Sequence, residues 1–178
     1  WWKGRATRHI LTPAMYAKAL LPLLRSLKLR ILLEPGRFIS GNAGILVTRV
    51  EYVKRTGHKN FVIVDAAMND LIRPAFYDSY HEIIPVRQVR GHRRIADVVG
   101  PICESGDYFA KDRPLPRVEA GSLLALMSAG AYGSVMASNY NSRPFAAEVL
   151  VHGRKTALVR HRQKLADLWQ EERIPAWL

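Results

Sequence analysis

The fold of this chain is decided by one stretch, Leu32-Leu33-Glu34-Pro35-Gly36-Arg37-Phe38-Ile39-Ser40-Gly41-Asn42-Ala43-Gly44. The short apolar run at residues 31–33 predicts a β-strand. An acid, a Pro-Gly turn and a base follow directly, and Gly36 permits close backbone approach. These groups could line a site for an anion and a cationic ring. On their own they are more typical of a surface corner between two strands.

The segment before this stretch predicts an amphipathic helix. Thr12 is a suitable N-cap and Pro13 a suitable first helical residue. Apolar residues then recur at three- and four-residue steps over residues 15–27. A helix that leads into a strand with a functional corner is typical of the last unit of a (β/α)₈ barrel, where phosphate often binds. The pattern alone fits any α/β unit.

From residue 45 onward the sequence predicts mainly β-structure. We expect strands at residues 45–54, 61–64, 82–87, 95–99, 122–127, 146–151 and 156–160, of which the last two form a hairpin. Pro74 predicts the first turn of a short helix, on which Arg73 and Tyr77 lie four residues apart and face the same way. Residues 163–171 predict a terminal helix that ends before Pro175.

The composition is that of a globular protein with an excess of basic residues. Lysine and arginine number 27 against 15 acidic residues, which gives a formal net charge of +12. The dense basic patch is residues 87–94. No aromatic residues interleave with it, so we expect a solvated loop and not a nucleic-acid surface. No apolar run reaches the ~20 residues that cross a bilayer, and we expect no membrane partner.

Cys103 is the only cysteine of the chain. A single cysteine excludes an internal disulfide framework and suits a reducing cytosol, so we expect a cytoplasmic protein. The six histidines have no metal-ligand spacing. We therefore expect no metal site.

Four blocks of sequence resemble the pyridoxal-phosphate-dependent decarboxylases of the alanine-racemase-like fold (fold type III). The first is Glu34-Pro35-Gly36-Arg37 with Gly41-Asn42-Ala43-Gly44. The others follow in the family's order and at about its spacing: Val64-Asp65-Ala66-Ala67-Met68-Asn69-Asp70 with Arg73-Pro74 and Tyr77; Cys103-Glu104-Ser105-Gly106-Asp107; and Gly130-Ala131-Tyr132-Gly133 with Ser138-Asn139-Tyr140-Asn141-Ser142-Arg143-Pro144. The set covers roughly residues 12–175. It is more similar to the diaminopimelate decarboxylases than to the ornithine- or arginine-cleaving members.

The resemblance implies an α+β protein in two parts. Residues 1–38 would be the tail end of a (β/α)₈ barrel, its last helix and strand, with residues 1–11 unassigned. Residues 39–178 would form a mostly β C-terminal domain, a Greek-key-like sheet or barrel with short helices. The chain would then be the C-terminal portion of a homodimeric decarboxylase that converts meso-2,6-diaminopimelate to L-lysine and CO₂ in lysine biosynthesis.

The resemblance also implies pyridoxal 5'-phosphate as cofactor, an electron sink that the protein must bind and orient. The cofactor-binding residues would be Glu34, Pro35, Gly36, Arg37 and Tyr132. Glu34 would lie against the ring nitrogen and keep it protonated. Backbone N–H groups around Gly36 and the hydroxyl of Tyr132 would hold the phosphate. Taken singly, Tyr132 is more typical of a packed aromatic residue.

By the same resemblance the substrate-binding residues are Arg37, Arg73, Tyr77, Glu104 and Tyr132. Arginine suits a distal carboxylate because its planar fork can bond both oxygens, and Glu104 would hold the distal ammonium. Taken singly, Arg73 is more often a surface or ion-pair arginine.

Cys103 is assigned by the resemblance as the catalytic acid that returns a proton to the substrate carbon. An ordinary cysteine thiol is mostly protonated at neutral pH, which suits that role. Members of the family present this loop across a two-fold interface. Cys103 and Glu104 would then complete the site of the other subunit.

The sequence also departs from the family pattern. The lysine that binds the cofactor covalently is not found in this chain, and Lys18 does not replace it because it lies on the predicted first helix. We therefore expect this chain to be inactive by itself. Residues 1–10 lack the expected glycine-rich phosphate loop, and Ala67 and Phe145 stand where glycine and a basic or small residue are expected. Two alternatives stay open: an ornithine- or arginine-type decarboxylase, and a non-catalytic β module that binds a partner chain or a polyanion.

Overall fold

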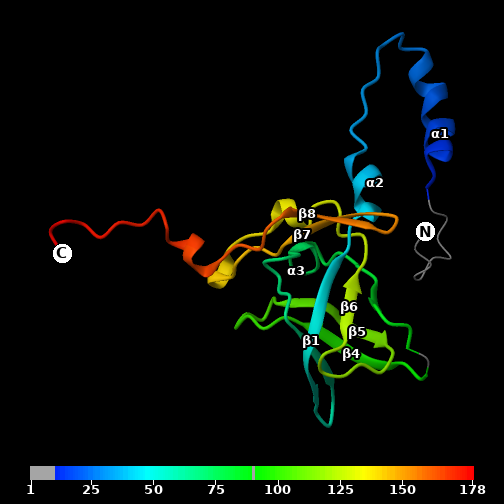
Figure 1. Cartoon of the computed structure of the whole chain (residues 1–178). Helices are drawn as coiled ribbons and strands as arrows, with labels where there is room; N and C mark the ends of the chain where they lie inside the picture. Colours follow the sequence, from blue (N-terminus) through cyan, green and yellow to red (C-terminus); the bar gives the residue numbers. More distant parts are fainter. Residues whose placement is uncertain (1–10, 90) are drawn as a thin grey trace. The chain divides into compact units, whose positions relative to one another are not determined.

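The structure is a computed structural model that describes residues 11–89 and 91–178 (Figure 1). It divides the chain into two compact units, Trp1–Gly36 and Arg37–Leu178, and each is described by itself. The segment expected to carry the glycine-rich phosphate loop, residues 1–10, and Arg90 of the basic patch lie outside the described residues. The assignment of residues 1–38 to the end of a barrel stays a prediction.

The first unit contains the helix α1, Pro13–Arg25. Its start is confirmed as predicted: Thr12 is the N-cap, and its side chain accepts a hydrogen bond from the backbone N–H of Met15 at 3.2 Å. The strand predicted at residues 31–33 is wrong. A β-strand needs a hydrogen-bonded neighbour, and no described residue pairs with this segment.

The second unit is built on a six-stranded sheet in the order β3-β6-β1-β2-β4-β5. The strands are β1 (Leu46–Arg55), β2 (Asn60–Val64), β3 (Ile83–Pro85), β4 (Arg94–Val99), β5 (Tyr108–Leu115) and β6 (Leu123–Leu126). All neighbours are antiparallel except β2 and β4, which are parallel. The domain is therefore mostly β, as predicted.

The long strand β1 joins the two halves of this sheet (Figure 1). Residues 46–49 pair with β6, whereas the rest of the strand pairs with β2, and the register shifts between Val50 and Tyr52. From the end of β2 the chain crosses to β3 at one edge and then returns to β4 beside β2. This crossing carries the short helix α3, Arg73–Tyr77.

Side chains from all six strands form one hydrophobic core. Phe109 is its largest fully buried member, and the burial of such a ring is worth about 1.5–3 kcal/mol. Other members from the strands are Val50, Val62, Val64, Ile83, Ala96, Val98, Ala110, Leu115, Leu124 and Leu126. A mostly β domain with one core confirms the predicted α+β class.

Three local predictions differ from the structure. Strand β5 was not predicted, because the charged residues 111–113 and Pro114 interrupt its apolar pattern. It is an edge strand, where proline is tolerated. The strand predicted at residues 82–87 is limited to β3. The helix predicted at residues 163–171 is a single 3₁₀ turn, Leu165–Leu168, whose Leu165 is exposed, so no apolar face is buried to stabilise a longer helix.

Other local predictions are confirmed. Strands β7 (Glu148–His152) and β8 (Lys155–Arg160) form the expected hairpin as a separate two-stranded sheet. The helix α3 starts beside Pro74 as expected. The corner between two strands that residues 34–37 alone suggested is, however, wrong: the residues after Pro35 form a short helix, α2 (Gly36–Ser40), and a 3₁₀ turn, Gly41–Ala43. Within the described part of the chain, no helix is long and apolar enough to cross a membrane.

Candidate functional site

The structure places the predicted site residues on both units. Glu34, Pro35 and Gly36 belong to the first unit. The remaining ones, Arg37, Arg73, Tyr77, Cys103, Glu104 and Tyr132, belong to the second. The convergence of Glu34 with the other residues therefore stays a prediction.

Arg73 is the centre of a cationic and aromatic cluster. Its guanidinium carbon lies 5.9 Å from the centroid of the Tyr77 ring and 5.7 Å from that of Tyr132. Burial, and next the positive charge of Arg37, lower the pKa of Arg73 below its ordinary value. The structure thus brings together four of the predicted residues, as the shared face of α3 led us to expect for Arg73 and Tyr77.

The guanidinium of Arg73 has unused hydrogen-bonding capacity. One terminal nitrogen donates to Ser79 Oγ at 3.1 Å, whereas Nε is buried and has no hydrogen-bond partner among the described residues. A buried N–H donor without an acceptor costs folding free energy, and in native proteins such a donor is usually satisfied by a water molecule, an ion or a ligand. The Arg73 cluster can therefore bind an anionic group such as a carboxylate.

Local backbone geometry holds this cluster in place. Helix α3 ends at Asp78, which adopts the left-handed conformation (φ +50°) and returns its N–H to the carbonyl of Arg73. Tyr132 also has a positive φ, +57°. This conformation is unusual for a tyrosine and costs of the order of 1 kcal/mol, and such strain is often found at functional sites.

His81 is a buried neighbour of Arg73 that could not be selected from the sequence. Its side chain is 1% exposed, and its Nδ1 lies 2.8 Å from the carbonyl oxygen of Met127, so that Nδ1 carries the proton. Nε2 is then an acceptor, and it is buried with no partner in residues 11–89 and 91–178. Burial first, and then the charges of Arg73 and other arginines, lower the pKa of His81. His81 is therefore neutral beside the Arg73 cluster.

Cys103 and Glu104 lie on the loop between β4 and β5. Cys103 is exposed and can meet another molecule. Glu104 accepts hydrogen bonds from the N–H of Gly106 at 3.0 Å and from the hydroxyl of Tyr140 at 3.4 Å. Among the described residues, no hydrogen bond, ion pair or ring contact joins Cys103 or Glu104 to the Arg73 cluster.

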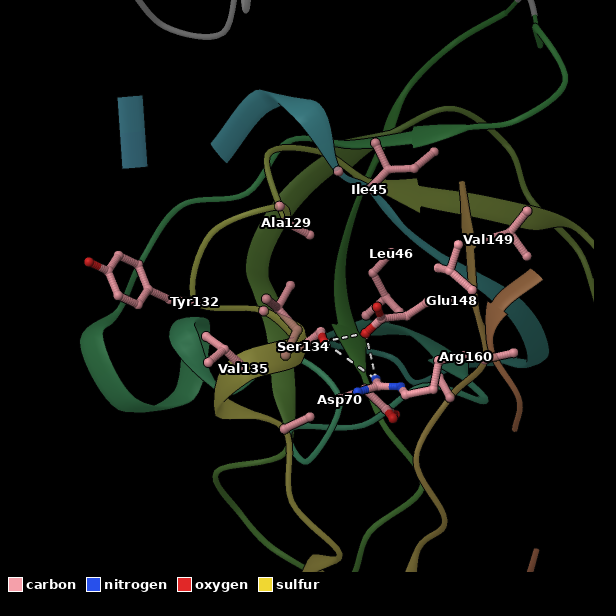
Figure 2. A pocket seen from close by; sticks show the side chains of 18 of the residues that line it. Ile45, Leu46, Asp70, Ala129, Tyr132, Ser134, Val135, Glu148, Val149 and Arg160 are labelled. Atoms are coloured by element: carbon pink, nitrogen blue, oxygen red, sulfur yellow. Dashed lines mark hydrogen bonds and ion pairs between the residues drawn. The ribbon is translucent and has the colours of Figure 1, made fainter. Parts of the chain in front are cut away.

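A cavity of about 420 Å³ lies between the loop that carries Tyr132 and the β7–β8 hairpin (Figure 2). Most of its lining is apolar, but Glu148 and Arg160 form an ion pair of 2.6 Å, and Ser134 donates to Glu148. Figure 2 shows the Tyr132 ring pointing away from these three side chains. The ion pair was not predicted, although Glu148 and Arg160 are opposite each other in the hairpin register.

The described residues contain no group of three or more His, Cys, Asp or Glu side chains that could hold a metal ion. The candidate site is therefore built from arginines, tyrosines and single acidic groups. Such a set suits an anionic organic ligand.

Sequence comparison identifies the family. A profile described as "Pyridoxal-dependent decarboxylase, C-terminal sheet domain" matches residues 9–130. The chain belongs to this family. The family predicted from the motif blocks is thereby confirmed, and so is the mostly β fold of the matched domain; the matched range contains the first three blocks, whereas the fourth lies beyond it except for Gly130.

Relatives and solved structures within this family are closely similar. Diaminopimelate decarboxylase of Vibrio cholerae is 55% identical over 163 residues, 91% of this chain and 39% of the relative. A crystal structure from Aquifex aeolicus has a TM-score of 0.87 at 49% identity and covers 93% of this chain and 41% of that chain. Diaminopimelate decarboxylase of Helicobacter pylori, complexed with L-lysine, has a TM-score of 0.84 at 43% identity, with 93% and 41% covered. The chain thus spans less than half the length of these relatives.

Proposed function

We propose that the chain is the C-terminal sheet domain of a pyridoxal-phosphate-dependent decarboxylase that converts meso-2,6-diaminopimelate to L-lysine and CO₂. The observation that carries this proposal is the Arg73 cluster. Its buried Nε, which has no partner in the described part of the chain, and its two flanking tyrosine rings suit the second carboxylate of a diacid. An amino acid without that carboxylate leaves the arginine unpaired.

The residues of the second unit fit the cofactor as well. The phosphate of pyridoxal phosphate needs several hydrogen-bond donors. Two side chains of the second unit can donate: the guanidinium of Arg37 and the hydroxyl of the exposed Tyr132. Glu34, Pro35 and Gly36 complete the proposed cofactor set. When bound, the cofactor supplies an electron sink for the negative charge left on the carbon that loses CO₂.

The remaining roles follow from the chemistry of the side chains. Arg73, assisted by Arg37 and Tyr77, holds the distal carboxylate and so orients the substrate. Glu104 holds the distal ammonium. The Cys103 thiol donates its proton to the substrate carbon after CO₂ has left.

We also propose that the protein is a cytoplasmic homodimer, in which the Cys103 loop serves the site of the other subunit. Support comes from the exposure of Cys103 and from the exposed apolar residues of the β7–β8 hairpin, such as Leu150 and Val159. Apolar surface of this kind is typical of an interface. Size measurement of the full-length protein by light scattering tests this directly.

The substitution R73A in the full-length protein tests the proposed function. Loss of hydrogen bonds to a charged group costs about 1.5–3 kcal/mol each, so we expect kcat/KM for the diacid to fall about a hundredfold or more. Activity on ornithine, which lacks the distal carboxylate, should change only a few-fold. The control is R55A, which removes an exposed arginine at the end of β1, outside the hairpin.

Two outcomes contradict the proposal. One is an equal loss of kcat/KM for the diacid and for ornithine in the R73A variant, which would mean that Arg73 does not bind the distal carboxylate. The other is a wild-type protein that decarboxylates ornithine but not the diacid. The second result would favour the ornithine-type relatives.

A further inference from the structure

Asp107 connects two loops of the second unit through a single buried carboxylate. The residue is 4% exposed. Its Oδ2 accepts the N–H of Ile102 at 2.8 Å, and its Oδ1 accepts the N–H of Met68 at 2.7 Å. Ile102 starts the Cys103–Glu104 loop, whereas Met68 belongs to the loop that leads into α3.

Gly100 reserves the space that this carboxylate fills. A Cβ atom on Gly100 would lie 2.3 Å from Oδ2 and 2.4 Å from Oδ1 of Asp107. The backbone N–H of Gly100 also donates to the carbonyl of Asp107 at 3.0 Å. Any side chain at position 100 therefore displaces the carboxylate.

The bonds of Asp107 close the loop that presents the thiol. Within this loop the N–H of Glu104 donates to the carbonyl of Ile102 at 2.8 Å, and the N–H of Asp107 donates to the carbonyl of Glu104 at 3.0 Å. These two bonds form a tight turn around Cys103. The carboxylate of Asp107 then fixes this turn to its own first residue and to the Met68 loop.

Burial of the negatively charged Asp107 carboxylate is unfavourable because the charge loses contact with water. Burial raises the pKa of Asp107 above its ordinary 3.8, and the hydrogen bonds from Ile102 and Met68 oppose that rise. Buried carboxylates are tolerated where backbone N–H groups satisfy them.

We propose that Asp107 is a positioning residue, which holds the Cys103–Glu104 loop against the Met68 loop and so sets where the Cys103 thiol can deliver its proton. This inference rests on the proposed function for the role of the thiol. The position of the loop itself can be measured without any substrate. The two ideas can therefore fail separately.

The test uses the full-length protein with three substitutions. D107N keeps the size of the side chain but turns an amide NH₂ toward one of the two N–H donors. G100A leaves Asp107 in place and displaces its carboxylate. D97N is the matched control, because Asp97 is also buried (6% exposed), accepts a backbone N–H, that of Asp112, at 2.7 Å, and lies outside the loop.

Two readouts report the loop directly. The first is the alkylation rate of Cys103 by iodoacetamide, followed on the Cys103 peptide by mass spectrometry. The second is amide hydrogen exchange over residues 100–108. We expect D107N and G100A to speed exchange about tenfold, the effect of one lost hydrogen bond of about 1.4 kcal/mol, and to speed alkylation several-fold. D97N should leave both at the wild-type values.

Turnover of the diacid gives a third readout. We expect kcat of D107N to fall about tenfold because the proposed acid, Cys103, is displaced, and we expect KM to rise as well because Glu104, on the same loop, holds the distal ammonium. Unchanged alkylation and exchange in D107N, at a loss of thermal stability equal to that of D97N, would overturn the proposal. If D107N does not fold, G100A carries the same test. If the wild type does not act on the diacid, the proposed function fails, while alkylation and exchange still decide the role of Asp107.

Discussion

The contact between Gly44 and Gly130 gives the sharpest prediction about the fold around Tyr132. A Cβ atom on Gly130 would lie 2.1 Å from the carbonyl oxygen of Ser40 and 2.6 Å from the nitrogen of Gly44. Two backbone hydrogen bonds cross the same contact. The N–H of Ala129 donates to the carbonyl of Gly44 at 2.8 Å, and the N–H of Gly130 donates to the carbonyl of Gly41 at 3.0 Å. Only glycine at position 130 permits this approach, and Tyr132 follows two residues later.

The substitution G130A should therefore be strongly destabilising. The atoms in the way belong to the backbone and cannot rotate aside. The two hydrogen bonds are worth about 1 kcal/mol each, and the forced separation adds about 1–3 kcal/mol. We expect a loss of about 3 kcal/mol in the free energy of unfolding. For a domain of this size that corresponds to a fall in Tm of about 6–12 °C.

Thermal unfolding by circular dichroism measures this effect, with G57A as the matched control. A Cβ on Gly57 meets no atom within 4 Å, so its melting temperature should stay close to that of the wild type. Because Tyr132 lies on the displaced loop, G130A should also lower kcat/KM for the diacid in protein that is still folded at 25 °C. A G130A variant that melts within 1–2 °C of the wild type would refute the argument from close backbone approach.

Two further predictions concern buried polar side chains. The pKa of His81 is lowered below 6.5, chiefly by burial. As the pH falls from 6.5 through the lowered pKa, the unfolded state binds a proton at His81 more readily than the folded state does, so the free energy of unfolding should decrease. H81N should weaken this dependence of stability on pH, as measured by thermal melts from pH 7 to pH 4. R143A should lower the free energy of unfolding in urea by about 2–3 kcal/mol, because Arg143 Nε donates to the buried Asn69 Oδ1 at 3.0 Å. R143K should recover only part of the lost stability. Equal stability of the wild type, R143A and R143K would contradict the role of this hydrogen bond.

Much of the sheet could be predicted from the sequence, because apolar runs of strand length are a local signal. The strands predicted at residues 61–64, 95–99 and 122–127 lie within one residue of β2, β4 and β6 at each end. Strand β5 gave no such signal, since an edge strand pairs on one side only and tolerates charges and Pro114. The segment at 31–33 shows the reverse case: its sequence is suitable for a strand, but a strand forms only where a partner is available.

Some residues of the candidate site could be predicted from the sequence, and others could not. The pairing of Arg73 with Tyr77 follows from helical spacing and could be predicted, and the structure adds Tyr132 to them. The buried acceptors His81 and Asp107 could not be selected. Their importance depends on which distant backbone groups they meet, such as the N–H of Met68, 39 residues away from Asp107. Hydrophobic periodicity carries no information about such contacts.

The loops of the candidate site are held by buried polar groups in place of sheet pairing. Asp107 binds the loop at Met68, Arg143 binds Asn69 in the same loop, and Asn69 in turn exchanges hydrogen bonds with the backbone of Ser138 at 3.0 and 3.1 Å. Loops leave backbone donors and acceptors that a sheet would satisfy, so side chains must satisfy them when the loops are buried. The Cys103 loop, the segment leading to Arg73 and the segment of residues 138–143 are therefore fixed to one another. A substitution in any one of them should alter hydrogen exchange in the other two, a stronger coupling than the separate turns of the sequence would suggest.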